Sequence, residues 1–360
     1  MTRALPPTAK GGAVASDRPP SRHATIRDVS KLADVSRMTV SRVLSNPELV
    51  KAETRERVLQ AVASLNYVPD RTAGSLSTRR TGFVALVLPT LTNVNFSMVA
   101  HGLTDVLRPK AFQLLITYDN YSQQERETQI RNLLARRPEA IVLVGAAHSR
   151  GAAALLAQVD IPVIEVADDT TRPVQHAVGF SNQEAGRMAG QHFIRRGFTR
   201  IGALASQPHG DLADHRGEAR IRGLEAELRL NGLSTERILR DGDAPVSYDH
   251  GAAKLGLLLD RHPDVEAVFC VSDLAAVGAL MECQRRGVAV PDQLSIMGFG
   301  DFDIGRVVNP SLTTIRADFQ DIGRQAGQLV LDLLGPAPPA APEMIDVGLT
   351  LVERGSVGHR

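Results

Sequence analysis

Continuous apolar runs, separated by stretches of helical length, dominate the chain beyond residue 82. Runs that are apolar throughout are typical of parallel strands buried on both faces of a sheet. They occur in two sets, which predict two doubly wound α/β lobes with a ligand cleft between them, at the carboxyl ends of the strands. The runs are FVALVLP (83–89), FQLLITY (112–118), AIVLVG (140–145) and PVIEV (162–166) in the first set, and RIGALAS (200–206), AVFCVSD (267–273) and LSIMGFG (294–300) in the second.

The sequence lacks the fingerprints of the common nucleotide and metal sites. No GxGxxG follows the first run, and GxxxxGK[ST], HExxH and metal-spaced Cys/His sets do not occur. No nucleophile–base pair stands out, so we predict a binding protein without metal or cofactor and not an enzyme. No apolar run approaches the length of a membrane span, so no membrane partner is expected.

Four of the ten histidines and both cysteines stand in contexts that indicate neither a metal site nor a redox pair. The histidines are expected to be solvated in loops, which is the default for this side chain. The cysteines are expected to be small core residues of a reduced, cytoplasmic protein, because no CxxC occurs. The residues concerned are His148, His176, His209 and His215, and Cys270 and Cys283.

Residues 23–68 carry the spacing of a small helical unit. Residues 26–33 and 37–46 predict two short helices, the first capped by Thr25 with Asp28 and the second by Ser36. A turn at 34–36 separates them, and a third helix follows from about 52 to 66. Two short helices joined by a tight turn make a helix-turn-helix, which inserts the start of its second helix into the DNA major groove. The predicted inward faces are Ile26, Val29, Leu32 and Ala33; Val40, Val43 and Leu44; and Val58, Ala61, Val62 and Leu65.

Charge is distributed unevenly along the chain. Residues 1–80 hold 14 Lys+Arg and 7 Asp+Glu, a net of +7, which leaves 27 basic and 33 acidic residues, a net of −6, in the remainder. A basic head on an acidic body indicates an anionic partner for the head alone. Residues 1–22, rich in Pro, Gly, Ala and Arg without periodicity, are expected to form a disordered arm.

Residues 69–81 read as a linker that contains a weak helix. Gly74, Ser75 and Ser77 disfavour a helix there, so we expect it to form only against a partner or DNA. Leu76 is the type of apolar side chain that wedges into a minor-groove base step, and the alternative is that it packs on the body.

These motifs together resemble the lactose-repressor (LacI) family of bacterial transcription regulators over residues 24–356. T-I-R-D-V-S-x-x-A-x-V-S-x-x-T-V-S-R-V-L is similar to the family's headpiece and Y-V-P-D-R-T-A-x-S-L to its hinge helix. F-T-R-I-G, R-I-R-G-L, F-C-V-S-D-L-A-A-V-G, V-P-D-Q-L-S-I-M-G-F-G and P-S-L-T-T-I are similar to its effector domain. The resemblance implies an all-α helix-turn-helix headpiece (23–68), a hinge helix (69–81) and a two-lobed core (82–360) like the periplasmic sugar-binding proteins. It assigns about 82–180 and 313–334 to lobe 1, and about 181–312 and 335–360 to lobe 2.

The resemblance also implies site residues and partners. Family members are homodimers or dimers of dimers that bind palindromic operator DNA, in the cytoplasm and on the nucleoid. The implied DNA contacts are Thr25, Ser36, Arg37, Met38, Thr39, Ser41, Arg42 and Arg71, with Leu76 opening the central operator step. The implied effector contacts are Asn95, Phe96, His148, Glu165, Arg220, Ser272, Phe299, Gly300 and Asp301, with Arg220 as the guanidinium fork for an acid.

Four positions depart from the family pattern. Asp34 stands where the headpiece turn usually has Gly, and Asp70 where the hinge usually has Asn. Ser272 replaces the Asn of an Asn-Asp pair, and Gly300 replaces the Asp that follows the Gly-aromatic pair. The motifs E-V-A-D, V-G-F-S-N and G-F-G-D-F-D-I-G look like the gluconate-type regulators of the family, which implies a sugar-acid effector.

Two other interpretations stay open. The effector is alternatively a neutral sugar or a nucleoside, since a few pocket residues decide the choice. The core alone also fits a solute-binding protein, against which the basic headpiece and the absence of a secretory signal argue. Because residues 344–360 read as a strand and a polar tail without a heptad repeat, we expect a dimer and not a tetramer.

Overall fold

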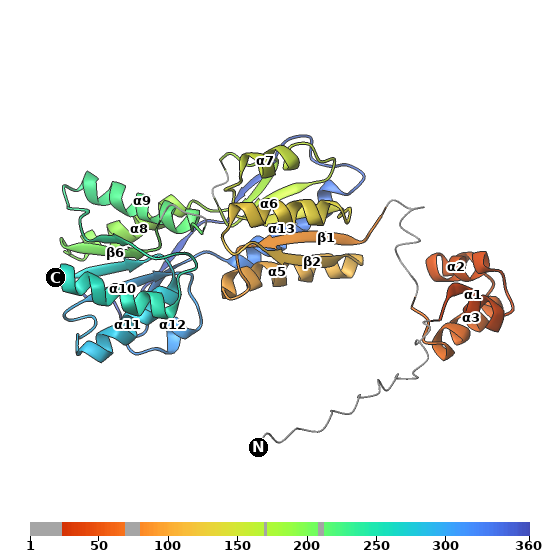
Figure 1. Ribbon diagram of the computed structural model, residues 1–360, viewed down its shortest axis with the longest axis horizontal. Helices are drawn as coiled ribbons and strands as arrows, with labels where there is room; N and C mark the ends of the chain where they lie inside the picture. The colour runs from red at the N-terminus through yellow and green to blue at the C-terminus, as the bar shows by residue number, and fades with distance from the viewer. Residues whose placement is uncertain (1–23, 69–79, 169–170, 208–211) are drawn as a thin grey trace, which may run out of the picture. The chain divides into compact units, whose positions relative to one another are not determined.

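The computed structural model describes residues 24–68, 80–168, 171–207 and 212–360 (Figure 1). They form two compact units, one within residues 1–79 and the other within 80–360. Arg71, Leu76 and most of the predicted hinge helix, with the arm 1–22, lie outside the described residues. Among the described residues, no helix is both long and apolar enough to cross a membrane.

The N-terminal unit is a three-helix headpiece. It contains α1 (Ile26–Leu32), α2 (Arg37–Ser45), the 3-10 turn η1 (Pro47–Leu49) and α3 (Ala52–Ser64). The backbone nitrogen and hydroxyl of Thr25 both donate to Asp28, at 2.9 and 2.7 Å, and Ser36 accepts from the backbone of Thr39. These contacts satisfy polar groups at the two helix starts, as the sequence predicts.

The headpiece core differs from the prediction at one position. The side chains of Val29, Val40, Val43 and Val58 are buried together, but Leu32 is 57% exposed. The helical spacing explains this, because Val29, Ala33 at the C-cap of α1 and the partly buried Ile26 lie on one face, and position 32 lies beside it. Asp34 has φ 48°, so it adopts the left-handed conformation that is typical of Gly at this turn.

The core consists of two lobes, each with a six-stranded sheet between two layers of helices (Figure 1). The first sheet has the order β11-β5-β4-β3-β1-β2 and is parallel along every pairing. Its strands are β1 (Phe83–Leu88), β2 (Gln113–Tyr118), β3 (Ala140–Val144), β4 (Val163–Val166), β5 (His176–Gly179) and β11 (Met344–Asp346). Its helices are α5 (Val94–Leu107), α6 (Gln123–Leu134), α7 (Arg150–Leu156) and α13 (Phe319–Leu333), with the 3-10 turn η2 (Arg108–Lys110) after α5.

Side chains of lobe 1 alternate between two apolar layers. Along β1, Val84 and Leu86 pack on the side of α5, whereas Ala85 and Val87 pack on the side of α6 and α7. Both faces of the strand are therefore buried, which explains why its sequence is apolar without alternation.

The second lobe repeats this architecture. Its sheet has the order β12-β10-β9-β8-β6-β7, and only the β10–β12 pair is antiparallel. The strands are β6 (Ile201–Ala205), β7 (Ile238–Arg240), β8 (Ala267–Cys270), β9 (Ser295–Phe299), β10 (Thr313–Arg316) and β12 (Thr350–Val352). The helices are α8 (Asn182–Arg195), α9 (His215–Leu230), α10 (Tyr248–Arg261), α11 (Asp273–Arg286) and the short α12 (Ile304–Val307).

The assignment of the C-terminal segments to the lobes differs from the expectation. Strand β10, expected in lobe 1, pairs with β9 of lobe 2, and β11, expected in lobe 2, pairs with β5 of lobe 1. The chain therefore crosses between the lobes three times: after β5, between β10 and α13, and between β11 and β12. These strands are three or four residues long, and so short a strand leaves no apolar run in the sequence.

The two lobes also meet at loops between the crossovers. An isolated antiparallel bridge joins Ser122, at the start of α6 in lobe 1, to Leu212 in the segment before α9 of lobe 2. The ring of Phe180, at the first crossover, lies 5.8 Å from those of Phe299 of lobe 2 and Phe319 of lobe 1. These contacts close the cleft between the lobes.

Helices α8 and α9 cross at backbone contact distance. A Cβ added to Gly186 of α8 would overlap the backbone oxygen of Arg220 in α9, and one added to Gly223 of α9 would overlap that of Gln183 in α8. Any larger side chain at these positions would force the two helices apart.

Gly186→Ala is therefore expected to lower the free energy of unfolding by about 1–3 kcal/mol, because its methyl group meets backbone that cannot rotate away. Urea unfolding of the full chain measures this. The matched control is Gly151→Ala in α7, where the added methyl meets only the carboxylate end of Glu127. If both variants lose equal stability, the helix crossing is not the cause.

Candidate ligand-binding cleft

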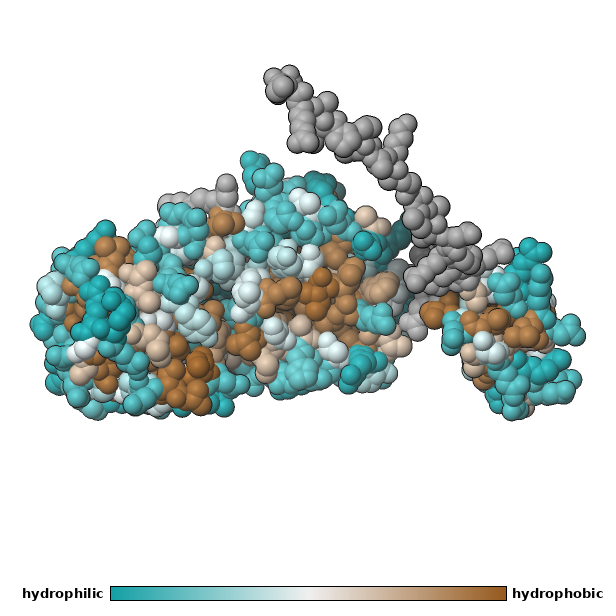
Figure 2. Space-filling view, turned by 60° about the horizontal axis from the view of Figure 1, so that its bottom comes forward, coloured by the Kyte–Doolittle hydropathy of each residue, from teal (hydrophilic) through white to brown (hydrophobic). Residues whose placement is uncertain are grey.

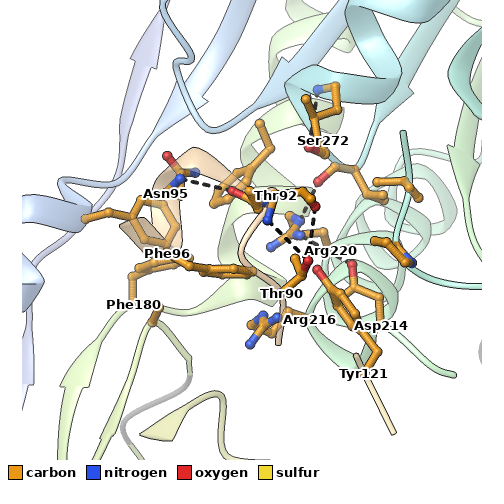
Figure 3. Close-up of a pocket in the computed structure, with 18 residues that line it drawn as sticks. Thr90, Thr92, Asn95, Phe96, Tyr121, Phe180, Asp214, Arg216, Arg220 and Ser272 are labelled. Atoms are coloured by element: carbon orange, nitrogen blue, oxygen red, sulfur yellow. Dashed lines mark hydrogen bonds and ion pairs between the residues drawn. The ribbon is translucent and has the colours of Figure 1, made fainter. Parts of the chain in front are cut away.

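A pocket lies between the lobes at the carboxyl ends of both sheets (Figure 3). It encloses about 550 Å³, including its mouth. Lobe 1 lines it with the segment after β1, with Tyr121 after β2 and with residues at the crossovers. Lobe 2 lines it with the start of α9 and with residues after β7, β8 and β9. The main lining side chains are Thr90, Thr92, Asn95, Phe96, Tyr121, Phe180 and Phe319 from lobe 1, and Asp214, Arg216, Arg220, Val246, Ser272 and Phe299 from lobe 2.

Arg220 is held rigidly at the base of this pocket. Its Nε donates to the carbonyl of Val271 at 3.1 Å, and its Nη1 donates to the side-chain oxygen of Asn182. The guanidinium carbon lies 4.2 Å from the ring centroid of Phe299. Burial lowers the pKa of Arg220 to about 10, so the group still carries its charge at neutral pH. Its Nη2 makes only a 3.9 Å contact with Asp214, which leaves donors for a ligand.

Arg216 supplies a second guanidinium from the preceding turn of α9. It lies 5.0 Å from the ring centroid of Phe96 and 5.9 Å from that of Tyr121, both of lobe 1. Burial opposes its charge, but Asp214, Tyr121 and Asp168 outweigh this and raise the pKa of Arg216 above its ordinary value. Burial and Asp214 in turn raise the pKa of the Tyr121 phenol, which stays protonated.

The remaining lining combines aromatic faces with neutral polar groups. Figure 3 shows Phe96 and Phe180 side by side on one flank, with Thr90, Thr92 and Asn95 close by and Ser272 on the opposite wall. Aromatic faces accept the C–H surface of a sugar, while hydroxyl and amide groups bind its hydroxyls. Two buried cations beside such a surface suit a small polyhydroxylated anion.

Five of the nine predicted effector residues come together in this pocket. Asn95, Phe96, Arg220, Ser272 and Phe299 all line it. The family resemblance implied all five. Asn95 and Phe96 lie at the start of α5, Arg220 on α9, Ser272 directly before α11, and Phe299 at the end of β9.

The other four do not line this pocket. His148 and Glu165, whose side chains are both buried, contact each other with 2.5 Å between Nε2 and Oε1, and Glu165 also accepts from the backbone of Val174 at 2.8 Å. Glu165, on β4, therefore holds the loop of His148 and the loop of Val174 in place. His148 and His176 are buried, against the expectation of solvated histidines.

The turn after β9, with Gly300 and Asp301, contacts other residues of lobe 2. Gly300 has φ 130°, and a Cβ there would lie 2.6 Å from the Phe302 ring. The carboxylate of Asp301 is buried against Arg354, Arg306 and Arg316. Asp301 thus neutralises lobe 2 arginines, and this pairing keeps it from serving as a free acceptor in the pocket.

The sequence interpretation missed Arg216, Asp214 and Tyr121. Arg216 was detectable in principle, because it precedes Arg220 by four residues and the two share a helix face. Asp214 and Tyr121 stand in loops without periodicity, and only the closed lobes bring them together.

The headpiece presents the predicted DNA contacts as a separate surface. Arg37, Met38, Ser41 and Arg42 of α2 are exposed, and Met38 is 71% exposed. Thr25 and Ser36 form the helix caps, and the hydroxyl of Thr39 lies 2.8 Å from that of Ser36. The basic and thioether side chains are not used in the headpiece core, which leaves them available for a partner.

Asp273 supports the pocket from beneath Ser272. It is fully buried and accepts hydrogen bonds from the Thr314 hydroxyl at 2.6 Å and the Phe302 backbone at 2.8 Å. Burial, with the nearby charge of Asp301, raises the pKa of Asp273 to about 6. The native state therefore favours the protonated acid. The protonated carboxyl of Asp273 stabilises the fold at low pH, and this stabilisation is lost as pH rises through about 6.

We predict that Asp273→Asn removes this pH dependence. Relative to the variant, the original chain should lose about 2 kcal/mol of unfolding free energy between pH 4 and pH 7, because its aspartate must ionise while buried. Urea unfolding at several pH values measures the difference. Asp303→Asn is the matched control, since the side chain of Asp303 is 96% exposed. Parallel pH profiles for the original chain and Asp273→Asn would contradict the prediction.

Known proteins match both units of this chain. Residues 25–70 match the family described as bacterial regulatory proteins of the lacI family, and residues 191–357 match the periplasmic binding protein-like domain. The transcriptional regulator GntR of Escherichia coli K12 is 30% identical over 92% of this chain and 98% of its own length. IdnR, a transcriptional regulator of the same strain, is 33% identical over 85% and 91%.

A solved structure extends the likeness to three dimensions. A LacI-family regulator from Silicibacter pomeroyi, 30% identical, has a TM-score of 0.86 over 93% of this chain and 99% of its own. Its coverage includes headpiece and core, so the helix-turn-helix and the two-lobed fold are both confirmed. The relatives are transcriptional regulators and not enzymes. The chain therefore belongs to the LacI family of DNA-binding transcriptional regulators.

Proposed function

We propose that this regulator is a repressor of sugar-acid catabolism that responds to an aldonate such as gluconate in the cleft. The observation that carries the proposal is the pair of buried guanidinium groups, Arg216 and Arg220, on one face of α9. A neutral sugar would leave the remaining donors of Arg220 without a charged acceptor in a desolvated site. A carboxylate pairs with them at two points.

The closed cleft supports a role for the ligand in switching. Arg216 of lobe 2 reaches the Phe96 and Tyr121 rings of lobe 1, so a carboxylate bound at the arginines favours closure of the lobes. A ligand that binds one lobe arrangement more tightly shifts the equilibrium toward it. Each half of a dimer presents one headpiece, so closure changes how the headpieces meet the operator.

Arg220→Ala should abolish gluconate binding to the full chain, because it removes the fork that receives the carboxylate. Isothermal titration with gluconate, 6-phosphogluconate, 2-ketogluconate and neutral hexoses measures this. The control is Arg222→Ala, an exposed arginine two residues further along α9. Binding of a neutral hexose together with silence from every acid would overturn the sugar-acid proposal and leave the family assignment intact.

A homodimer is supported by the apolar surface of the core. Figure 2 shows apolar side chains gathered on its exposed face, and the described exposed residues include Leu91, Val94, Ile116 and Tyr118 of lobe 1. Ile116 and Tyr118 lie on β2, the edge strand of the first sheet. Exposed apolar side chains along an edge strand favour association, so a second copy of the chain is the proposed partner of this face.

The headpiece is proposed to read operator bases with Arg37, Met38 and Arg42. Arg42→Ala should weaken operator binding by about 1–3 kcal/mol, the value of one good base contact, and barely change binding to unrelated DNA. Fluorescence titration of labelled operator at fixed salt measures both, and the end point should give two chains per duplex. Arg57→Ala, exposed on α3, is the control. Equal losses on both DNAs would make Arg42 a phosphate contact.

A further inference from the structure

The inter-lobe cleft contains a second cavity beside the pocket described above. It encloses about 330 Å³, including its mouth, and lies over the carboxyl ends of β1, β2 and β3 and the start of α6. Tyr121, Asp214 and Arg216 line both cavities, so the two cavities adjoin at these three residues. We call the pocket with Arg220 the first chamber and this cavity, lined also by Gln123 and Arg126, the second chamber.

One cation of the second chamber, Arg126, is already engaged. Arg126 donates to the Asp119 carboxylate at 2.8 Å, to the carbonyls of Gly145 and Ala147 at 3.3 and 3.0 Å, and to the carbonyl of Val144. A guanidinium has five N–H donors, and these four contacts use nearly all of them. Arg126 therefore stabilises the chamber wall and has little capacity left for an anion.

Two acceptors that line the second chamber have no partner among the described residues. They are Oδ1 of Asp214, whose side chain is only 9% exposed, and Oε1 of Gln123. The amide of Gln123 is fixed in direction, because its Nε2 donates to the Ala147 carbonyl at 3.2 Å and its oxygen then faces the other way. Buried acceptors without partners destabilise a folded protein, so a donor supplied by a ligand is favoured.

The two chambers therefore differ in the hydrogen-bonding groups that they leave unpaired. The first has unused N–H donors on Arg220 and suits an acceptor, the carboxylate. The second has unused acceptors and suits donors, the hydroxyl groups. Asp214 lies at the boundary, where one oxygen faces the Nη2 of Arg220 at 3.9 Å and the other is unpaired.

We infer that the effector spans both chambers: an open-chain polyhydroxy acid whose carboxylate binds Arg220 and whose distal hydroxyls bind Asp214 and Gln123. This rests on the proposed function and adds the ligand's orientation and extended shape. Ser122 and Ala213 line the second chamber. Ser122 forms the bridge to Leu212 that joins the lobes, and Ala213 is the residue after Leu212. A ligand that reaches this chamber thus contacts the part of the cleft that only closure creates.

The test combines shortening the ligand with removing one acceptor. Gluconate should bind the full chain more tightly than L-threonate, a four-carbon acid with the same C2 and C3 configuration beside the carboxylate and two fewer carbons. Gln123→Met keeps the length of the side chain but removes its amide oxygen. It should weaken gluconate binding about three- to tenfold, the value of one hydrogen bond, and leave L-threonate binding unchanged. Isothermal titration measures the four affinities.

Gln124→Met is the matched control, because Gln124 is the next residue of α6 and is exposed. It should change neither affinity. Equal weakening of both acids by Gln123→Met, or of neither, would overturn the two-chamber assignment even if Arg220→Ala abolishes binding. Binding of a neutral hexose that is weakened by Gln123→Met, with no acid bound, would retain the second chamber and overturn the sugar-acid proposal.

Discussion

The close backbone contact between α8 and α9 is the constraint on which the cleft depends. Gly186 and Gly223 let the two helices touch without intervening side chains. That contact brings Asn182 at the start of α8 within hydrogen-bond reach of Arg220 on α9. The orientation of the guanidinium is therefore decided by a helix crossing outside the pocket. A binding group gains precision when packing on rigid elements fixes its rotamer.

Burial of two like charges one helical turn apart needs compensation. Burial and the nearby charge of Arg216 lower the pKa of Arg220, whereas Asp214 and Asp168 favour the charged form of both arginines. Aromatic rings of Phe96 and Phe299 cover the guanidinium faces without using their N–H donors. The cleft thus keeps positive charge in a dry site while its hydrogen-bonding capacity remains for a ligand.

Much of the fold could be predicted because buried parallel strands are apolar throughout. The runs that become β1, β2, β3, β4, β6, β8 and β9 were all recognised, whereas the short β5, β7 and β10 were not. The pocket residues Asn95 and Ser272 were implied by the family resemblance. Pairings such as His148 with Glu165 could not be found, because no sequence spacing reveals which loops meet in space. Asp301 was misjudged for a similar reason, because its partner Arg354 is distant in sequence.

The three crossings between the lobes have a consequence for synthesis of the protein. The first sheet receives its covering helix α13 and edge strand β11 only after almost the whole second lobe has been made, and the second sheet is completed by β12, at residues 350–352. Neither lobe can finish folding while the ribosome still holds the end of the chain. The headpiece, whose three helices end at Ser64, has no such delay. A protein cut short by a nonsense codon before residue 344 would therefore have a complete headpiece attached to two incomplete lobes.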